Sequence, residues 1–182
     1  MEIAECKSRL LELIKEHALT IGDFTLSSGK KSKYYLDERV VTLSAEGAYL
    51  TARVILDMLK GVEVDAVGGP TVAADPIAGA VAAVSHAEGC PVDGFIVRKE
   101  PKAHGMGKQI EGPVESGSRV VIVDGTMTTG GSVIKAIGAV EKMGCKVVKV
   151  ILLIDRLEGG REKIEEKGYD FAAVFTRDDL LE

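Results

Sequence analysis

Residues 120–132 read Val120-Val121-Ile122-Val123-Asp124-Gly125-Thr126-Met127-Thr128-Thr129-Gly130-Gly131-Ser132. The run of branched apolar residues at the start is typical of a strand that is buried on both faces. From Ser132 to Met143 the apolar residues recur at helical spacing, and Gly144 follows as a stop signal. The stretch therefore predicts a strand, a short loop and a helix, which are the parts of a βαβ unit.

The same alternation extends along the chain. Apolar runs predict further strands over residues 64–69, 94–98, 146–154 and 171–175. Helices are expected over residues 3–17, 44–60 and 77–86, the last of them opened by Asp75 as N-cap and Pro76 as first helical residue. Strands that alternate with helices predict an α/β fold with an open, mostly parallel β-sheet flanked by helices.

Composition narrows the class of protein. The 182 residues suit one domain, and 46% hydrophobic with 28% charged residues excludes a disordered chain. A net charge of −5 argues against nucleic acid as a partner. The charged N-terminus is not a signal peptide, and no apolar run is long enough to span a membrane. Three dispersed cysteines without metal spacing fit reduced thiols, so we expect a cytoplasmic protein.

In open α/β sheets, ligands bind beyond the C-terminal ends of the strands. At one such end, Asp124 precedes residues 128–132, a loop of threonine, glycine and serine that leads into a helix. The free N–H groups and dipole of a helix N-terminus, with Gly130 and Gly131 allowing close approach, predict a phosphate site. An ordinary polar turn is the alternative interpretation.

Two other phosphate motifs do not fit. A Walker A loop requires lysine where Gly131 stands. The pair Gly105 and Gly107 lacks the third glycine of a dinucleotide fingerprint and does not follow a strand.

Three further strand ends carry polar residues. Residues 98–112 form a basic, glycine-containing segment, in which cations could close over a polyanion; a solvated loop is the alternative. Arg156 offers a planar fork for a carboxylate or an imide-like edge, or else forms a surface ion pair. Residues 68–71 could form a second anion-binding turn. Together these features predict a phosphate-rich sugar substrate.

Residues 120–132 resemble the phosphoribosyl-pyrophosphate (PRPP) motif of type I phosphoribosyltransferases. Residues 24–37, 67–80, 98–105 and 154–156 narrow the resemblance to the orotate phosphoribosyltransferases. The resemblance implies a type I phosphoribosyltransferase fold in a single domain. Residues 1–43 would form an N-terminal helix and a small hood, and residues 44–182 an α/β core with a mobile loop over 99–112.

The resemblance also implies an activity: transfer of the 5-phosphoribosyl group from PRPP to orotate, which gives orotidine 5′-monophosphate and pyrophosphate in pyrimidine (UMP) biosynthesis. Mg²⁺ would be held mainly by PRPP, and a homodimer would share loop 99–112 between subunits. Catalytic roles would fall to Arg98, Lys99, Lys102 and His104 at the pyrophosphate and to Asp124 at the ribose hydroxyls. PRPP would be bound by Asp124, Gly125, Thr126, Met127, Thr128, Thr129, Gly130, Gly131 and Ser132. Orotate would be bound by Thr128, Arg156, Tyr34 and Tyr35.

One position departs from the family pattern, because Gly125 stands where a second acid is usual. Losing one charged hydrogen-bond partner costs roughly 1.5–3 kcal/mol, which predicts about a ten- to hundredfold weaker stabilisation of the transition state unless water or another group compensates. Two alternatives therefore remain. The chain could be a transferase for another base, or a PRPP- or nucleotide-binding regulator with reduced turnover.

Overall fold

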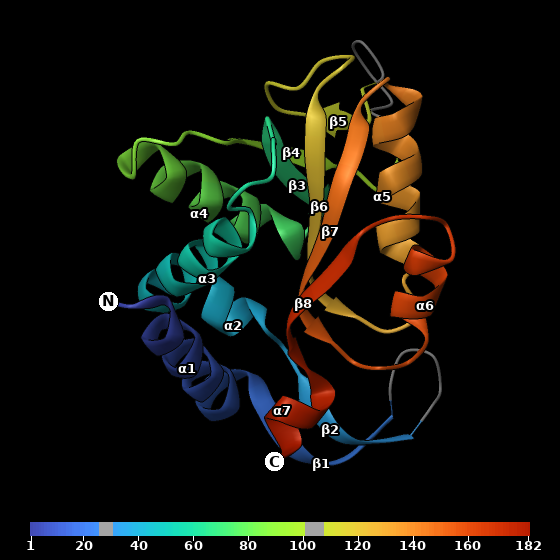
Figure 1. The fold of residues 1–182 in the computed structure, drawn as a ribbon. Helices are drawn as coiled ribbons and strands as arrows, with labels where there is room; N and C mark the ends of the chain where they lie inside the picture. The colour runs from blue at the N-terminus through green and yellow to red at the C-terminus, as the bar shows by residue number, and fades with distance from the viewer. Residues whose placement is uncertain (26–30, 101–107) are drawn as a thin grey trace.

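The computed structural model describes residues 1–25, 31–100 and 108–182. Within these residues the strands form a six-stranded sheet in the order β5-β4-β3-β6-β7-β8 and a separate two-stranded sheet, β1-β2 (Figure 1). The large sheet consists of β3 (Ala66–Pro70), β4 (Asp93–Val97), β5 (Ile110–Glu111), β6 (Arg119–Met127), β7 (Lys146–Asp155) and β8 (Phe171–Thr176). All neighbours pair in parallel except β5, which runs antiparallel to β4. The predicted open, mostly parallel sheet is confirmed.

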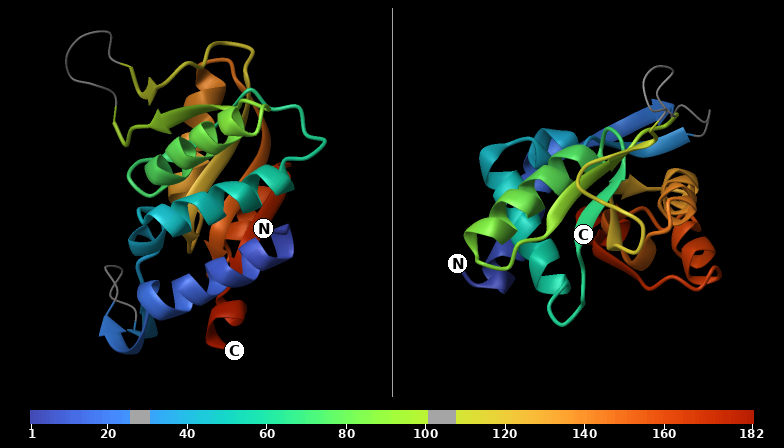
Figure 2. Two further views of the ribbon diagram at one scale, coloured as in Figure 1. Left: turned by 90° about the vertical axis from the view of Figure 1, so that its left-hand side faces the viewer. Right: turned by 90° about the horizontal axis from the view of Figure 1, so that it is seen from above.

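Helices cover both faces of this sheet (Figure 2). Along β6, Val121 and Val123 belong to a core cluster with the N-terminal helices, whereas Val120 and Ile122 pack in a second cluster with α5. A strand buried on both faces is continuously apolar, which is why the 120–123 run predicts it. The helices are α1 (Ile3–Leu13), α3 (Ala45–Met58) and α4 (Ala74–Ala87), then α5 (Gly131–Lys142) and the short α2 (Arg39–Thr42), α6 (Gly160–Glu165) and α7 (Arg177–Leu181).

Several predicted boundaries shift. The first helix leaves α-helical geometry after Leu13 and continues as the π-helical turn η1 (Ile14–Ala18). The N-cap of α4 is Ala73 rather than Asp75. Pro76 then occupies the third helical position, where its missing N–H costs nothing because first-turn N–H groups have no partner within the helix. Ser44 is the N-cap of α3, as its hydroxyl accepts a hydrogen bond from the N–H of Gly47 at 3.1 Å.

The sequence did not predict the hairpin of β1 (Leu19–Thr25) and β2 (Lys31–Leu36), which lies beside α7 at the bottom of Figure 1. Its second strand alternates in burial, with Tyr34 and Leu36 buried and Tyr35 exposed. Because most other residues of this strand are polar or basic, the sequence does not show the regular alternation of apolar and polar residues from which a strand is predicted. The hairpin lies within residues 1–43, where the resemblance implies an N-terminal helix and a hood.

Candidate active site

The parallel strands β3, β4, β6 and β7 end at one edge of the sheet. Pro70 lies opposite Val97 in the ladder of β3 and β4, and Met127 lies opposite Asp155 in the ladder of β6 and β7. The four polar segments that the sequence singled out follow or form these ends. The structure therefore gathers them at the edge where an open α/β sheet binds ligands.

The loop between β6 and α5 has the geometry of an anion cradle. Gly130 is the N-cap of α5 and has a left-handed backbone with φ 74° and ψ 6°, which favours glycine. The helix has 12 residues, so its first-turn N–H groups and dipole are available to an anion at this end. Thr128 is half-buried and Thr129 exposed beside these groups. The side chain of Met127 instead packs in the core, so any contact it makes with a ligand would be through its backbone.

Asp124 lies within strand β6, three residues before its end, and is only 5% exposed. Its carboxylate accepts hydrogen bonds from the N–H of Gly125 at 2.8 Å and from the hydroxyl of Ser132 at 3.3 Å. Burial raises the pKa of Asp124 to about 7, and the nearby Glu38 carboxylate adds to the rise. This acid is therefore bonded directly to Ser132 in the first turn of α5, and a second acid lies nearby.

That second acid, Glu38, comes from the turn between β2 and α2, and sequence reasoning missed it. Glu38 is 4% exposed. A Cβ atom placed on Gly125 would lie 2.7 Å from both Cγ and Cδ of Glu38, a distance that side-chain carbons do not tolerate. The space beside Gly125 is therefore filled by a carboxylate from another part of the chain.

Arg156 follows β7 and faces the hairpin. Its Nε donates to the hydroxyl of Tyr34 at 3.1 Å and lies 3.2 Å from a carboxylate oxygen of Glu158. Tyr34 and Arg156 also line a hollow of about 530 Å³ together with Arg177. Tyr35 points to the other side of β2, where its ring lies 5.7 Å from that of Phe24. The structure thus brings Tyr34 to Arg156 and leaves Tyr35 outside.

A smaller pocket of about 240 Å³ lies between β3, β4 and α5. Arg98 and Lys99 line it, as does Lys135 on α5, with Thr71 and Ser132 on its polar wall. Sequence reasoning missed Lys135, although its place three residues after Ser132 puts both on one helix face. The convergence of these cations beside the phosphate loop suits a polyanion.

The basic segment is only partly described. Lys102 and His104 lie outside the described residues. A backbone hydrogen bond joins the two ends of the segment, since the N–H of Arg98 donates to the carbonyl of Gln109 at 2.8 Å. The two-residue strand β5 lies within residues 99–112, the range in which the resemblance implies a loop.

Residues 68–71, which could form a second anion-binding turn, comprise the end of β3 and the first residue after it. Gly68 and Gly69 lie within β3 and neither has a positive φ, so these two glycines do not form the αR-αL type of anion nest. A Cβ on Gly68 would lie 2.6 Å from Cγ of Phe95, and one on Gly69 would lie 3.0 Å from Cβ of Ala74. These glycines allow close packing, whereas Pro70 and Thr71 line the pocket that holds Arg98 and Lys99.

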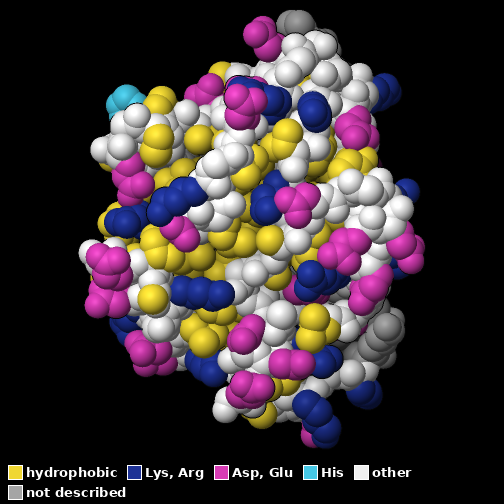
Figure 3. All heavy atoms as spheres, in the orientation of Figure 1, with side chains coloured by type: hydrophobic (Ala, Val, Ile, Leu, Met, Phe, Trp, Pro, Cys, Tyr) yellow, Lys and Arg dark blue, Asp and Glu magenta, His cyan; other side chains and the backbone are white. Residues whose placement is uncertain are grey.

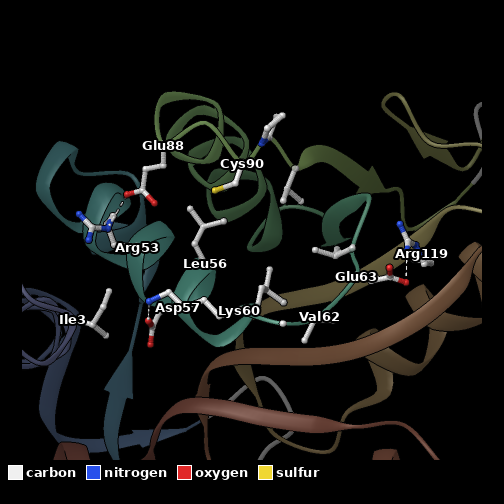
Figure 4. Close-up of a pocket in the computed structure, with 15 residues that line it drawn as sticks. Ile3, Arg53, Leu56, Asp57, Lys60, Val62, Glu63, Glu88, Cys90 and Arg119 are labelled. Atoms are coloured by element: carbon white, nitrogen blue, oxygen red, sulfur yellow. Dashed lines mark hydrogen bonds and ion pairs between the residues drawn. The ribbon is translucent and has the colours of Figure 1, made fainter.

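Another cavity, of about 520 Å³, lies near the opposite end of β6 (Figure 4). Its cations have acidic partners: Arg53 lies 2.9 Å from Glu88, and Arg119 lies 2.7 Å from Asp65. The face of the molecule in Figure 3 likewise shows basic and acidic side chains intermixed. A polyanion would gain little at this cavity, so the candidate active site is the edge that holds Asp124.

No group of three metal-ligating side chains occurs in residues 1–25, 31–100 and 108–182. A magnesium ion held mainly by substrate phosphates needs few protein ligands, so the site is compatible with an ion that enters with its substrate. In the described part of the chain, no helix combines the length and apolar character needed to cross a bilayer.

A family model, curated relatives and a solved structure all relate this chain to the same family. Residues 42–175 match the family model "Phosphoribosyl transferase domain". An orotate phosphoribosyltransferase of Rhodopirellula baltica is 46% identical over 173 residues, covering 92% of this chain and 90% of the relative. One from Aquifex aeolicus is 43% identical and covers 96% of this chain and 97% of the relative.

A solved structure of Mycobacterium tuberculosis orotate phosphoribosyltransferase in complex with PRPP superposes with a TM-score of 0.83 at 36% identity, covering 97% of this chain and 99% of that one. The similarity in sequence and the shared fold each extend over more than nine tenths of this chain. This chain belongs to the phosphoribosyltransferase family, among the orotate phosphoribosyltransferases.

Proposed function

We propose that this chain transfers the 5-phosphoribosyl group of PRPP to orotate, giving orotidine 5′-monophosphate and pyrophosphate in pyrimidine biosynthesis. The observation that carries the proposal is the position of Arg156. It stands at the same sheet edge as the phosphate loop, beside Tyr34, where a planar fork can bind a carboxylate in a bidentate way. Orotate carries such a carboxylate, whereas uracil lacks it.

Different site residues would bind different parts of PRPP and orotate. Residues 128–132 would bind the 5′-phosphate at the N-terminus of α5, and Asp124 would accept hydrogen bonds from the ribose hydroxyls. Arg98 and Lys99, with Lys135 across the same pocket, would bind the pyrophosphate. Lys102 and His104 keep the pyrophosphate role that the family resemblance implies. Thr128, Arg156 and Tyr34 would contact orotate, while Tyr35 would support the hairpin.

The chemistry requires little from the protein beyond charge and position. The bond between C1 of the ribose and the pyrophosphate oxygen breaks, and the electron pair leaves with pyrophosphate. A ring nitrogen of orotate then bonds to C1 and loses its proton. Positive charge develops on the ribose meanwhile, and the buried carboxylate of Asp124 is placed to stabilise it. The cations around the pyrophosphate stabilise the leaving group.

Three further properties belong to the same proposal. Mg²⁺ would accompany PRPP and neutralise part of the charge on its pyrophosphate. The enzyme would act as a cytoplasmic homodimer in which loop 99–112 is shared between subunits. Residues 1–182 would work as a single phosphoribosyltransferase domain, with the N-terminal helix and hood in residues 1–43 closing over the core in 44–182.

The test is an absorbance assay of orotate consumption with PRPP and Mg²⁺, accompanied by a pyrophosphate assay. We expect turnover with orotate and none with uracil, and an Arg156→Gln variant that fails on orotate while still binding PRPP. Pyrophosphate release with another base alone would favour a different transferase. PRPP binding without any pyrophosphate release would favour a regulator.

A further inference from the structure

The space beside Gly125, the position where a second acid is usual, is filled by the side chain of Glu38. The Cβ position of Gly125 lies 2.7 Å from the carboxyl carbon of Glu38. An aspartate at 125 would carry its own carboxyl carbon about 1.5 Å from its Cβ. The two carboxylates would therefore compete for the same volume, and the chain can hold one of them there.

The local backbone aims Glu38 inward. Its carbonyl accepts hydrogen bonds from the N–H groups of Val41 at 3.0 Å and Thr42 at 2.8 Å, which form the first turn after β2. On either side, Asp37 and Arg39 pair with each other at 2.8 Å at the surface. The Glu38 side chain lies between these two outward residues and is 4% exposed.

Two buried acids thus share one corner of the site. Within residues 1–25, 31–100 and 108–182, neither Asp124 nor Glu38 forms an ion pair with a cation. Burying carboxylates without a counter-charge is unfavourable, and burial raises the pKa of both groups. An arrangement of this kind is suited to positive charge that arrives with, or develops on, the substrate.

We propose that Glu38 is the second carboxylate of the ribose pocket, which accepts a hydrogen bond from a ribose hydroxyl of PRPP and stabilises the cationic ribosyl group together with Asp124. The inference rests on the proposed function. Gly125 is then no defect of the phosphate-loop strand, since its lack of a side chain makes room for Glu38. Asp124 already accepts bonds from Gly125 and Ser132, and a second carboxylate adds acceptors for two adjacent hydroxyls.

The first test is Glu38→Gln, which keeps the shape and removes the charge. We expect kcat/KM for PRPP to fall about ten- to hundredfold, with kcat reduced and the melting temperature unchanged or higher. Thr42→Val is the matched control, because Thr42 is buried in the same short helix and its hydroxyl has no hydrogen-bond partner among the described residues. A purely structural role for Glu38 would change stability and leave kcat/KM at the wild-type value.

The second test moves the carboxylate from one chain segment to the other. Gly125→Asp alone should lose activity and stability, because its side chain meets Glu38. Glu38→Ala should lose activity, and the double variant Glu38→Ala/Gly125→Asp should recover at least about tenfold over Glu38→Ala. The proposal is overturned if Glu38→Gln retains wild-type kcat/KM, or if the folded double variant shows no recovery. If the Gly125 variants do not fold, Glu38→Gln decides alone.

Calorimetric titration with PRPP and Mg²⁺ separates this inference from the proposed function. A wild-type protein that binds PRPP without consuming orotate would remove the orotate assignment. Glu38 would then still be judged by the PRPP affinity of Glu38→Gln against that of Thr42→Val. A wild-type protein that does not bind PRPP would overturn both.

Discussion

Nε of Arg156 lies 3.1 Å from the hydroxyl of Tyr34, although 122 residues separate them in the chain. The guanidinium carbon also lies 4.8 Å from the centre of the tyrosine ring. One contact therefore joins the hairpin to the end of β7 and orients the arginine side chain, which is 11% exposed. A preoriented guanidinium loses less freedom when it binds a planar carboxylate.

Tyr34→Phe removes the hydroxyl and keeps the ring. We expect the KM for orotate to rise up to about tenfold, the loss of one hydrogen bond to a charged group, with the KM for PRPP unchanged. Tyr35→Phe is the matched control, since Tyr35 faces Phe24 instead, and its kinetics should equal those of the wild type. Steady-state kinetics with each substrate varied in turn will show whether the effect is confined to orotate.

Lys135→Gln should weaken PRPP binding. Lys135 lines the pocket of Arg98 and Lys99, and removing one charged contact to phosphate should raise the KM for PRPP about tenfold. The difference should shrink at high ionic strength because salt screens exposed charges. Lys146→Gln, at the exposed start of β7, serves as control. Equal effects of the two substitutions would show only a general charge effect.

Gly130 and Gly131 should respond differently to alanine. Gly130→Ala places a side chain in a left-handed backbone of φ 74° and should lower the free energy of unfolding by about 1–2 kcal/mol. Around Gly131 a Cβ meets no atom within 4 Å, so Gly131→Ala should leave the melting temperature unchanged. If the loop cradles phosphate, Gly131→Ala should nevertheless weaken PRPP binding. Undiminished PRPP affinity in this variant would contradict the backbone cradle.

Asp124 should make stability depend on pH in the opposite sense to an ordinary carboxylate. Its pKa is about 7 in the folded protein, against 3.8 ordinarily, so the folded state holds a proton that the unfolded state has lost. The free energy of unfolding should therefore fall as the pH rises from about 4 to 7, by a few kcal/mol at most.

Denaturation of the wild type and Asp124→Asn at several pH values will measure this contribution. The variant should gain stability relative to the wild type as the pH rises towards 8, and the two should converge near pH 4. Because Asp37, Asp65 and Asp179 have lowered pKa values, their opposite pH dependence cancels in the difference. Parallel curves for the two proteins would show that Asp124 is ionised in the unliganded fold.

The sequence by itself determined the elements whose interactions are local. The apolar run before Asp124, the threonine and glycine residues after it and the helical spacing beyond Ser132 specify a strand, a loop and a helix without help from distant residues. The same reasoning predicted that the strand ends would meet at one edge, since parallel strands in one sheet all point the same way. For that reason the sequence could place Asp124, Arg98 and Arg156 at this edge of the sheet.

Only the tertiary structure decided which distant residues complete the site. Glu38 fills the space at Gly125 from 87 positions earlier, a relationship visible only once folding has brought the turn after β2 against β6. Lys135 joins the basic pocket, and Tyr34 rather than Tyr35 meets Arg156, because packing determines which face of each element turns towards the site. A carboxylate that is missing from a local motif can be supplied by any segment that folding brings near, because a carboxylate acts through its position in space and not through its place in the sequence.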